Sequence, residues 1–266
     1  MRFLQIGKLK TLFLLLLFIC ALGVTVWVQK GVVAAKNGEE VIEKIDSVVY
    51  RPQSEGVDYL AVDVDMPHVS KIVTKFYNQQ TKRNKSYQIK STLYWNHGKS
   101  DVKVFGLPEN SEAIRDILKK TLVVRKDVFF TTPFKELFKD FTVKVSGSHE
   151  LTATPKAGGV YKDSIEKYIL SFNSDYQVTS LEVFTVDARS ATTFSYTKLP
   201  NGKYVPNRSV MEIYGKGVPF RIVNDFQYGK TQTGHFFPTQ MTTSRFANDK
   251  LLEKAYAKFS NFRVKM

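Results

Sequence analysis

The sequence predicts an α+β protein built on one large, curved antiparallel β-sheet, an open half-barrel with a few helices covering the concave face. The chain has 20 Phe and 13 Tyr, and many short segments alternate apolar and polar residues, a pattern typical of sheets. These segments follow one another without the crossover helices that parallel strands need. Such a long sheet should curl, and its concave face must then be filled by helices or by a ligand.

The N-terminal 35 residues indicate export. A basic start precedes an apolar run over residues 11–28, and small residues follow up to Ala35; this order is typical of a cleaved signal peptide. Because about 18 uncharged apolar residues can also span a bilayer, an N-terminal membrane anchor is the alternative. In both cases we expect residues 36–266 to form one domain outside the cytoplasm, in the periplasm, attached to the inner membrane by residues 11–28 if the segment is retained.

The net charge favours an anionic partner. It is +14 for the whole chain, and residues 36–266 still carry 35 basic and 25 acidic groups, a net charge of +10. No basic helix, zinc-ligand spacing or aromatic RNA-binding motif is present, so nucleic acid is not expected as a partner. An anionic membrane surface or an acidic protein is the expectation, and a solvated basic surface without a partner is the alternative.

Helical spacing of apolar residues marks four segments. The first, with Val41, Ile45, Val48 and Val49, stops at Pro52, as helices do before proline. Ser111 suits a cap position of the second, and Pro133 suits the first turn of the third. The expected helices lie within residues 37–52, 109–120, 131–138 and 248–259.

Alternating segments separated by turn residues predict the strands. Three of them, residues 58–67, 70–80 and 85–95, precede the two middle helices and should open an antiparallel meander. The later expected strands lie within residues 140–147, 149–156, 166–173, 178–186, 191–199, 207–215, 219–230 and 235–246.

Residues 165–187 place large apolar side chains on both faces of two strands. On the first strand they share one face, whereas on the second Leu181 and Val183 oppose Phe184 and Val186. We expect one face to line an apolar cavity that binds a ligand; the alternative is a core filled by the same side chains. The candidate ligand-binding residues are Tyr168, Leu170, Phe172, Phe184, Phe194, Phe226 and Tyr228.

No catalytic or metal-binding motif is found in the sequence, so we expect neither an enzyme nor a cofactor. The four histidines stand far apart, with no metalloprotease pair, nucleophile elbow or phosphate loop. Asp63 and Asp65 alternate on one strand, but calcium usually takes six or more oxygen ligands, so a solvated strand face is the expectation there. Cys20 is the only cysteine, so the domain forms no disulfide.

Two stretches, "KDFTVKVSGSHELTATPK" and "IEKYILSFNSDYQVTSLEVFTVDARSATTFSYTKL", resemble the middle of the outer-membrane lipoprotein-sorting proteins, the LolA/LolB-like family. The stretch "GKYVPNRSVMEIYGKGVPFRIVNDFQYGK" is similar to a later hairpin of the same proteins. The resemblance covers residues 38–246 and is strongest over residues 138–228. It consists of a succession of strands and turns.

The resemblance implies a half-barrel with helices in its mouth, a dry apolar cavity and lipoprotein transport, in which acyl chains are held in the periplasm. The implied partners are a lipid or an acylated lipoprotein, and an inner-membrane transporter. The family's carriers also have a cavity arginine that ties the helices together, whereas "YWNHGKSDVKVFG" offers only Lys99 and Lys103. Related half-barrels act as envelope sensors, so a sensor or protein-interaction module with a filled half-barrel is the alternative function.

Overall fold

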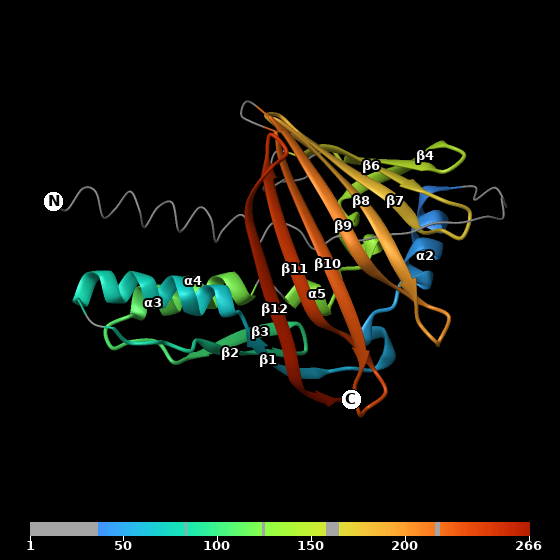
Figure 1. The fold of residues 1–266 in the computed structure, drawn as a ribbon. Helices are drawn as coiled ribbons and strands as arrows, with labels where there is room; N and C mark the ends of the chain where they lie inside the picture. The colour runs from blue at the N-terminus through green and yellow to red at the C-terminus, as the bar shows by residue number, and fades with distance from the viewer. Residues whose placement is uncertain (1–36, 83, 124–125, 158–164, 216–218) are drawn as a thin grey trace.

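A computed structural model describes residues 37–82, 84–123, 126–157, 165–215 and 219–266. These residues form an α+β fold, with a 12-stranded antiparallel sheet that curves into an open half-barrel (Figure 1). The expected signal peptide or anchor, residues 1–35, lies outside the described residues. Within them, no helix has the length and the apolar composition to cross a membrane.

The N-terminal part of the described chain mixes helices with three strands, and nine consecutive strands follow. The helices are α2 (Gly38–Val48), the 3₁₀ turn η2 (Pro52–Glu55), α3 (Pro67–Thr81), α4 (Glu112–Val123), α5 (Lys126–Phe129) and α6 (Phe134–Leu137). The strands are β1 (Tyr59–Asp65), β2 (Lys90–Asn96), β3 (Lys99–Phe105), β4 (Phe141–Gly147), β5 (Glu150–Pro155), β6 (Ile165–Phe172), β7 (Val178–Thr185), β8 (Ala188–Lys198), β9 (Tyr204–Gly215), β10 (Phe220–Lys230), β11 (Phe236–Ala247) and β12 (Lys250–Lys265).

The sheet is an antiparallel meander with one long-range connection. Its order is β3-β2-β1-β12-β11-β10-β9-β8-β7-β6-β5-β4, so the first and last described strands of the chain are neighbours. The sheet has two edges, β3 and β4, and does not close. Strand β12 pairs with β11 on one side and with β1 on the other. It therefore joins two blocks of the sheet, strands β1–β3 and strands β4–β11.

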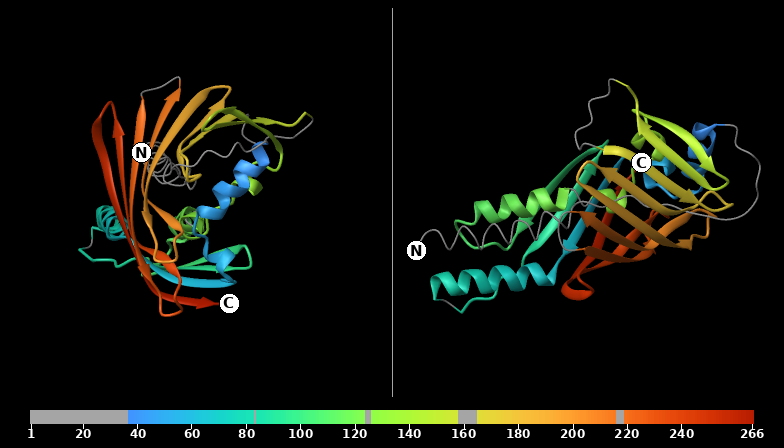
Figure 2. Two further views of the ribbon diagram at one scale, coloured as in Figure 1. Left: turned by 90° about the vertical axis from the view of Figure 1, so that its right-hand side faces the viewer. Right: turned by 90° about the horizontal axis from the view of Figure 1, so that it is seen from above.

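The helices occupy two places. Helix α2 lies inside the curve of the sheet near β4, and the short helix α5 lies inside it near β11 (Figures 1 and 2). Helices α3 and α4 accompany the β2–β3 hairpin and project with it beyond the half-barrel. We call residues 67–123, which contain these four elements, the arm.

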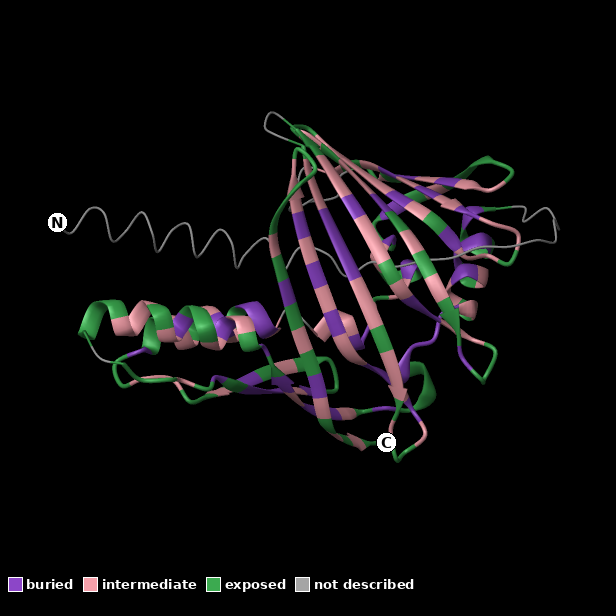
Figure 3. Ribbon diagram, viewed as in Figure 1, coloured by how far each residue is buried: buried purple, intermediate pink, exposed green. Residues whose placement is uncertain are grey.

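Two large apolar clusters fill opposite ends of the concave face. One joins α3, α4 and the segment of α5 to β1, β2, β11 and β12, with Leu60, Leu93, Leu122 and Phe237 among its fully buried members. The other joins α2 and α6 to β4–β7. Buried residues alternate with exposed ones along the long strands, as Figure 3 shows. The half-barrel is therefore filled at both ends by helices.

The expected strand at residues 70–80 is wrong, because this segment is helix α3. Its β-branched residues suggested a strand, but Val69 and Val73 are buried one helical turn apart and Pro67 occupies the first turn, which suits a helix start. Ser70 and Thr74 bond to the backbone of Ile89 and Tyr87. Packing and these side-chain bonds together override the strand propensity.

The expected helix at residues 248–259 is also wrong, because these residues start strand β12. Ala255 and Phe259 are buried, in register with strands on both sides. Asn248 and Asp249 have φ angles of 47° and 59°, which are the angles of a tight hairpin turn. This turn reverses the chain, so that β12 pairs antiparallel with β11 from Lys250 onward.

The other expected elements are confirmed. Helices α2, α4 and α6 and all the later strands lie where the sequence predicts them. Ser111 stands directly before α4 and donates its hydroxyl to the Pro108 carbonyl. Pro133 precedes α6 as its N-cap residue. The short helix α5 was not predicted.

Candidate functional site

The candidate site is the middle of the concave face, on strands β8 to β11. Its position follows from the register, in which each residue of one row pairs with the next: Leu151, Leu170, Leu181, Thr192, Met211, Ile222, Arg245 and Glu253. The row begins in the cluster under α2 and α6, so the whole row faces the concave side. We call the concave-facing residues of β8–β11 the central strip.

The central strip lies between the helix-covered ends. Met211 and Ile222 are buried there and belong to neither large cluster. Phe194 and Phe226 are half-buried, at its borders with the two clusters. Among the described elements, α2 packs against β4 and α5 against β11, and no helix makes a comparable contact with β8, β9 or β10. Met211 and Ile222 therefore form an apolar stretch between the two helix-covered clusters.

A row of hydrogen bonds crosses the central strip. Thr243 donates its hydroxyl to the Asn224 side-chain oxygen at 2.8 Å, and Asn224 donates its amide to Ser209 Oγ at 3.3 Å. Thr243 and Asn224 are buried, so these bonds offset the cost of removing polar groups from water. The row places polar atoms between Ile222 and Phe226 on the concave face of β10.

An ion pair borders this row at its β11–β12 side. Arg245, 4% exposed at its side chain, lies 3.1 Å from a carboxylate oxygen of Glu253. Arg245 is the concave neighbour of Ile222 on β10. A buried guanidinium beside an apolar strip can hold a carboxylate, a phosphate or a carbonyl oxygen of a ligand if one enters.

A second buried arginine, Arg51, binds Asp46, the residue that joins α2 to α6. Arg51 follows α2 and contacts the Asp46 carboxylate at 2.6 Å and the Asp46 carbonyl at 2.7 Å. The Asp46 carboxylate also accepts the backbone N–H groups of Phe134 and Lys135 at the start of α6, both at 2.9 Å. Burial lowers the pKa of Arg51, and the charge of Asp46 partly offsets this effect. We call this arrangement the α2–α6 clamp.

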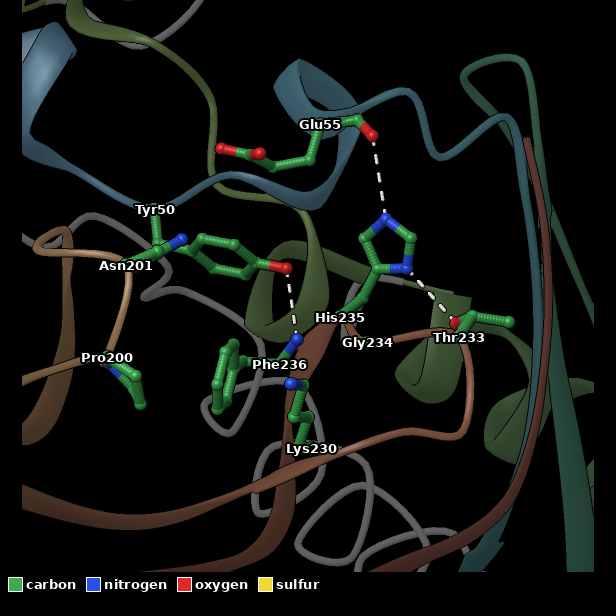
Figure 4. Close-up of a pocket in the computed structure, with 9 residues that line it drawn as sticks. All are labelled: Tyr50, Glu55, Pro200, Asn201, Lys230, Thr233, Gly234, His235 and Phe236. Atoms are coloured by element: carbon green, nitrogen blue, oxygen red, sulfur yellow. Dashed lines mark hydrogen bonds between the residues drawn. The ribbon is translucent and has the colours of Figure 1, made fainter.

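A pocket of about 440 Å³ opens where the β8–β9 and β10–β11 turns meet the segment after α2 (Figure 4). The His235 ring contacts Thr233 Oγ1 at 3.0 Å and the Glu55 carbonyl at 3.5 Å. Tyr50 accepts the Phe236 N–H at 3.0 Å, and burial raises the pKa of its hydroxyl. These polar groups are engaged in holding the turns together, and we interpret the pocket as a seam between loops.

The structure does not bring the seven sequence-predicted site residues into one wall. Three of them, Tyr168, Leu170 and Phe172, are buried within the cluster under α2 and α6. Phe184 lies on the other face, where the Lys167 ammonium is 4.5 Å from its ring centre. Phe194 and Phe226 border the central strip.

Tyr228 packs in a third, small cluster with Tyr50, Leu199 and Val205. Burial raises the pKa of its hydroxyl. Sequence reasoning did not single out Asn224, Thr243, Arg245 or Arg51. The one available signal was polar residues at inward-facing strand positions, such as Asn224 in the alternation of residues 219–230.

The described residues contain no group of three or more potential metal ligands of the His, Cys, Asp and Glu types. The Asp63 carboxylate accepts from Thr92 at 2.9 Å, Asn261 at 2.9 Å and Arg263 at 3.2 Å. Asp63 therefore links strands β1, β2 and β12.

No protein-family model, curated protein or solved structure matches this chain. The likeness to lipoprotein-sorting proteins is thus a resemblance of strand and turn pattern alone.

Proposed function

We propose that the protein binds a lipid, or the acyl part of a lipoprotein, along the central strip, as an exported carrier or lipid-binding protein of the cell envelope. The observation that supports this function is an apolar stretch of concave sheet, Met211 and Ile222 with Phe194 and Phe226 at its borders, that lies between the two helix-covered clusters. Each acyl CH₂ group moved from water into such a surface contributes about 0.8 kcal/mol, so a long chain binds without specific polar contacts.

The polar groups of the strip suit one end of such a ligand. Asn224 and Thr243 lie one register step from the Arg245 side chain. An ester carbonyl or a headgroup near this point finds hydrogen-bond donors, while the acyl chain extends over the apolar residues on either side. A transfer role would also need a donor protein at the inner membrane, as the resemblance implies.

Native mass spectrometry of the full chain, expressed in a bacterial envelope and purified gently, tests the proposal. We expect a co-purifying lipid or acylated peptide. The variant Phe194→Asp should lose most of it, because a carboxylate on the strip repels an acyl chain. The matched control is Phe184→Asp, the same change at a half-buried phenylalanine on the opposite face, and it should keep the ligand.

Two results would contradict this function. One is a protein that stays free of ligand after exposure to phospholipid and acylated peptide. The other is equal loss of the ligand in both variants while circular dichroism shows that both are folded. A protein-interaction module with a filled half-barrel would then be the better interpretation.

A further inference from the structure

The positive charge of the protein is concentrated in the arm. Residues 67–123 contain eleven basic and four acidic residues, a net charge of +7, out of the net +10 carried by residues 36–266. The remainder of that domain, although much longer, therefore contributes only +3. A segment that projects from the half-barrel (Figures 1 and 2) thus holds most of the charge that could attract an anionic partner.

Helix α3 orders this charge on one face. Lys71 and Lys75 are four residues apart and line the side opposite the buried Val69 and Val73, and Lys82 follows at the C-cap of the helix. The helix contains no Asp or Glu; the four carboxylates of the arm, Asp101, Glu109, Glu112 and Asp116, lie on β3, on α4 and in the turn before α4. The charged residues on the outer face of α3 are therefore all lysines.

These lysines are not neutralised within the described part of the chain. Lys71, Lys75 and Lys82 form no ion pair with any described residue, and neither does Lys85 in the turn after α3. Several cations of the half-barrel, in contrast, have a carboxylate partner, as do Arg189 with Glu182 and Arg208 with Asp225, each at 2.8 Å. Helix α3 and the turn after it therefore leave these four lysines available for a partner outside the protein.

Apolar side chains flank the lysines. Ile72 is 37% exposed, and Phe76, one turn further along α3, is half-buried. Ammonium groups next to exposed apolar groups on one helix side suit the boundary between lipid headgroups and acyl chains, where cations meet phosphate and apolar groups enter the bilayer.

We propose that the outer face of α3 docks the protein on an anionic membrane surface. Each lysine close to such a surface increases binding by about fivefold, so three of them acting together contribute about 100-fold. Docking through the arm leaves the half-barrel beside the membrane that would supply or receive its ligand. The inference rests on the charge and exposure of α3 and does not depend on acyl-chain binding.

Amine footprinting of the full chain tests this proposal. The protein is mixed with vesicles of phosphatidylcholine alone or of phosphatidylcholine and phosphatidylglycerol, and the acetylation rate of each lysine is read by mass spectrometry. We expect several-fold slower acetylation of Lys71, Lys75 and Lys82 on the anionic vesicles only, lost at high salt. The rates at Lys144, Lys250 and Lys254 on the half-barrel should not change.

Charge-reversal variants provide the second arm of the test. The variant K71E/K75E/K82E should remove the protection of the neighbouring Lys85, whereas K144E/K250E/K254E, with the same change in net charge and the same N-terminal segment, should retain it. Unprotected arm lysines on anionic vesicles would overturn the proposal, as would equal loss of protection in both variants. The variant Phe194→Asp should dock normally, which separates this test from that of the ligand site.

Discussion

At the scale of residues, the half-buried carboxyl group of Asp127 makes stability depend on pH. Asp127 lies in α5, two residues before Phe129, which with Phe130 belongs to the apolar cluster that contains α3 and α4. Burial raises the pKa of Asp127 above its ordinary value of 3.8, and the adjacent Lys126 offsets only part of this rise. The folded protein thus binds this proton more tightly than the unfolded chain does.

Ionisation of Asp127 should lower the stability of the fold as the pH rises. A raised carboxyl pKa costs no stability below about pH 3.8, where Asp127 is protonated in both states. As the pH rises through the folded-state pKa, the charged carboxylate destabilises the fold. We therefore expect Asp127→Asn, which resembles the protonated form, to raise the urea midpoint at pH 7 and to match the parent protein at the lowest pH.

The control for that measurement is Asp116→Asn, which removes one exposed carboxylate from α4. This variant should leave unchanged the difference between the urea midpoint at pH 7 and the urea midpoint at the lowest pH. A lower midpoint for Asp127→Asn at pH 7 would show that the carboxylate makes a favourable contact, contrary to the burial argument.

At the scale of elements, the α2–α6 clamp fixes the short helix α6, which has too few residues to be stable alone. Arg51→Met removes the guanidinium but leaves the Asp46 carboxylate with its two N–H donors. Breaking a buried ion pair from one side costs about 3–5 kcal/mol, so we expect a loss of that size in the free energy of unfolding, measured by urea titration.

The comparison for this variant is Lys135→Met, which breaks the exposed pair that joins Lys135 on α6 to Glu43 on α2 at 2.7 Å. Exposed pairs contribute little because water screens them, so this change should have a much smaller effect. Similar losses in the two variants would mean that the clamp does not depend on burial.

The elements were predictable from the sequence to the extent that local and tertiary preferences agree. In α2 the apolar spacing, the Asn37 cap and the stop at Pro52 all favour the same helix. In β12 the leucines at 251 and 252 and the alanines at 255 and 257 favour a helix, but pairing with two neighbouring strands overrides them. In α3 the opposite occurs, because a buried helical face overrides a β-branched sequence.

The candidate site was less accessible from sequence, since it depends on register across distant strands. The row from Leu151 to Glu253 contains residues from seven strands besides β5 that are brought together only by pairing. Alternation predicted that Phe194 and Phe226 face inward, but it gave no sign that helices would cover Tyr168 or that Met211 and Ile222 would lie between the two helix-covered clusters. Arg245 became a candidate only when the register placed it beside Ile222.

At the scale of the whole molecule, β12 makes the arm and the half-barrel one structural unit. It pairs with β1 on the arm side and with β11 on the half-barrel side. Phe259 of β12 is buried between them and meets the ring of Phe129 edge-on at 4.9 Å between centres. Because the two blocks share this strand, they should unfold together.

Two probes can test this coupling. Trp95, on β2 of the arm, stacks on Phe130 with ring centres 3.9 Å apart, so its fluorescence reports on the arm in a Trp27→Phe background, while far-UV circular dichroism follows the backbone of the whole chain. We expect the two urea transitions to coincide. Phe259→Ala, a large-to-small change in a buried cluster, should lower both midpoints together by an amount equivalent to about 3–5 kcal/mol. A variant in which fluorescence is lost at a lower urea concentration than the circular dichroism signal would show that the arm unfolds independently and that β12 does not couple the two blocks.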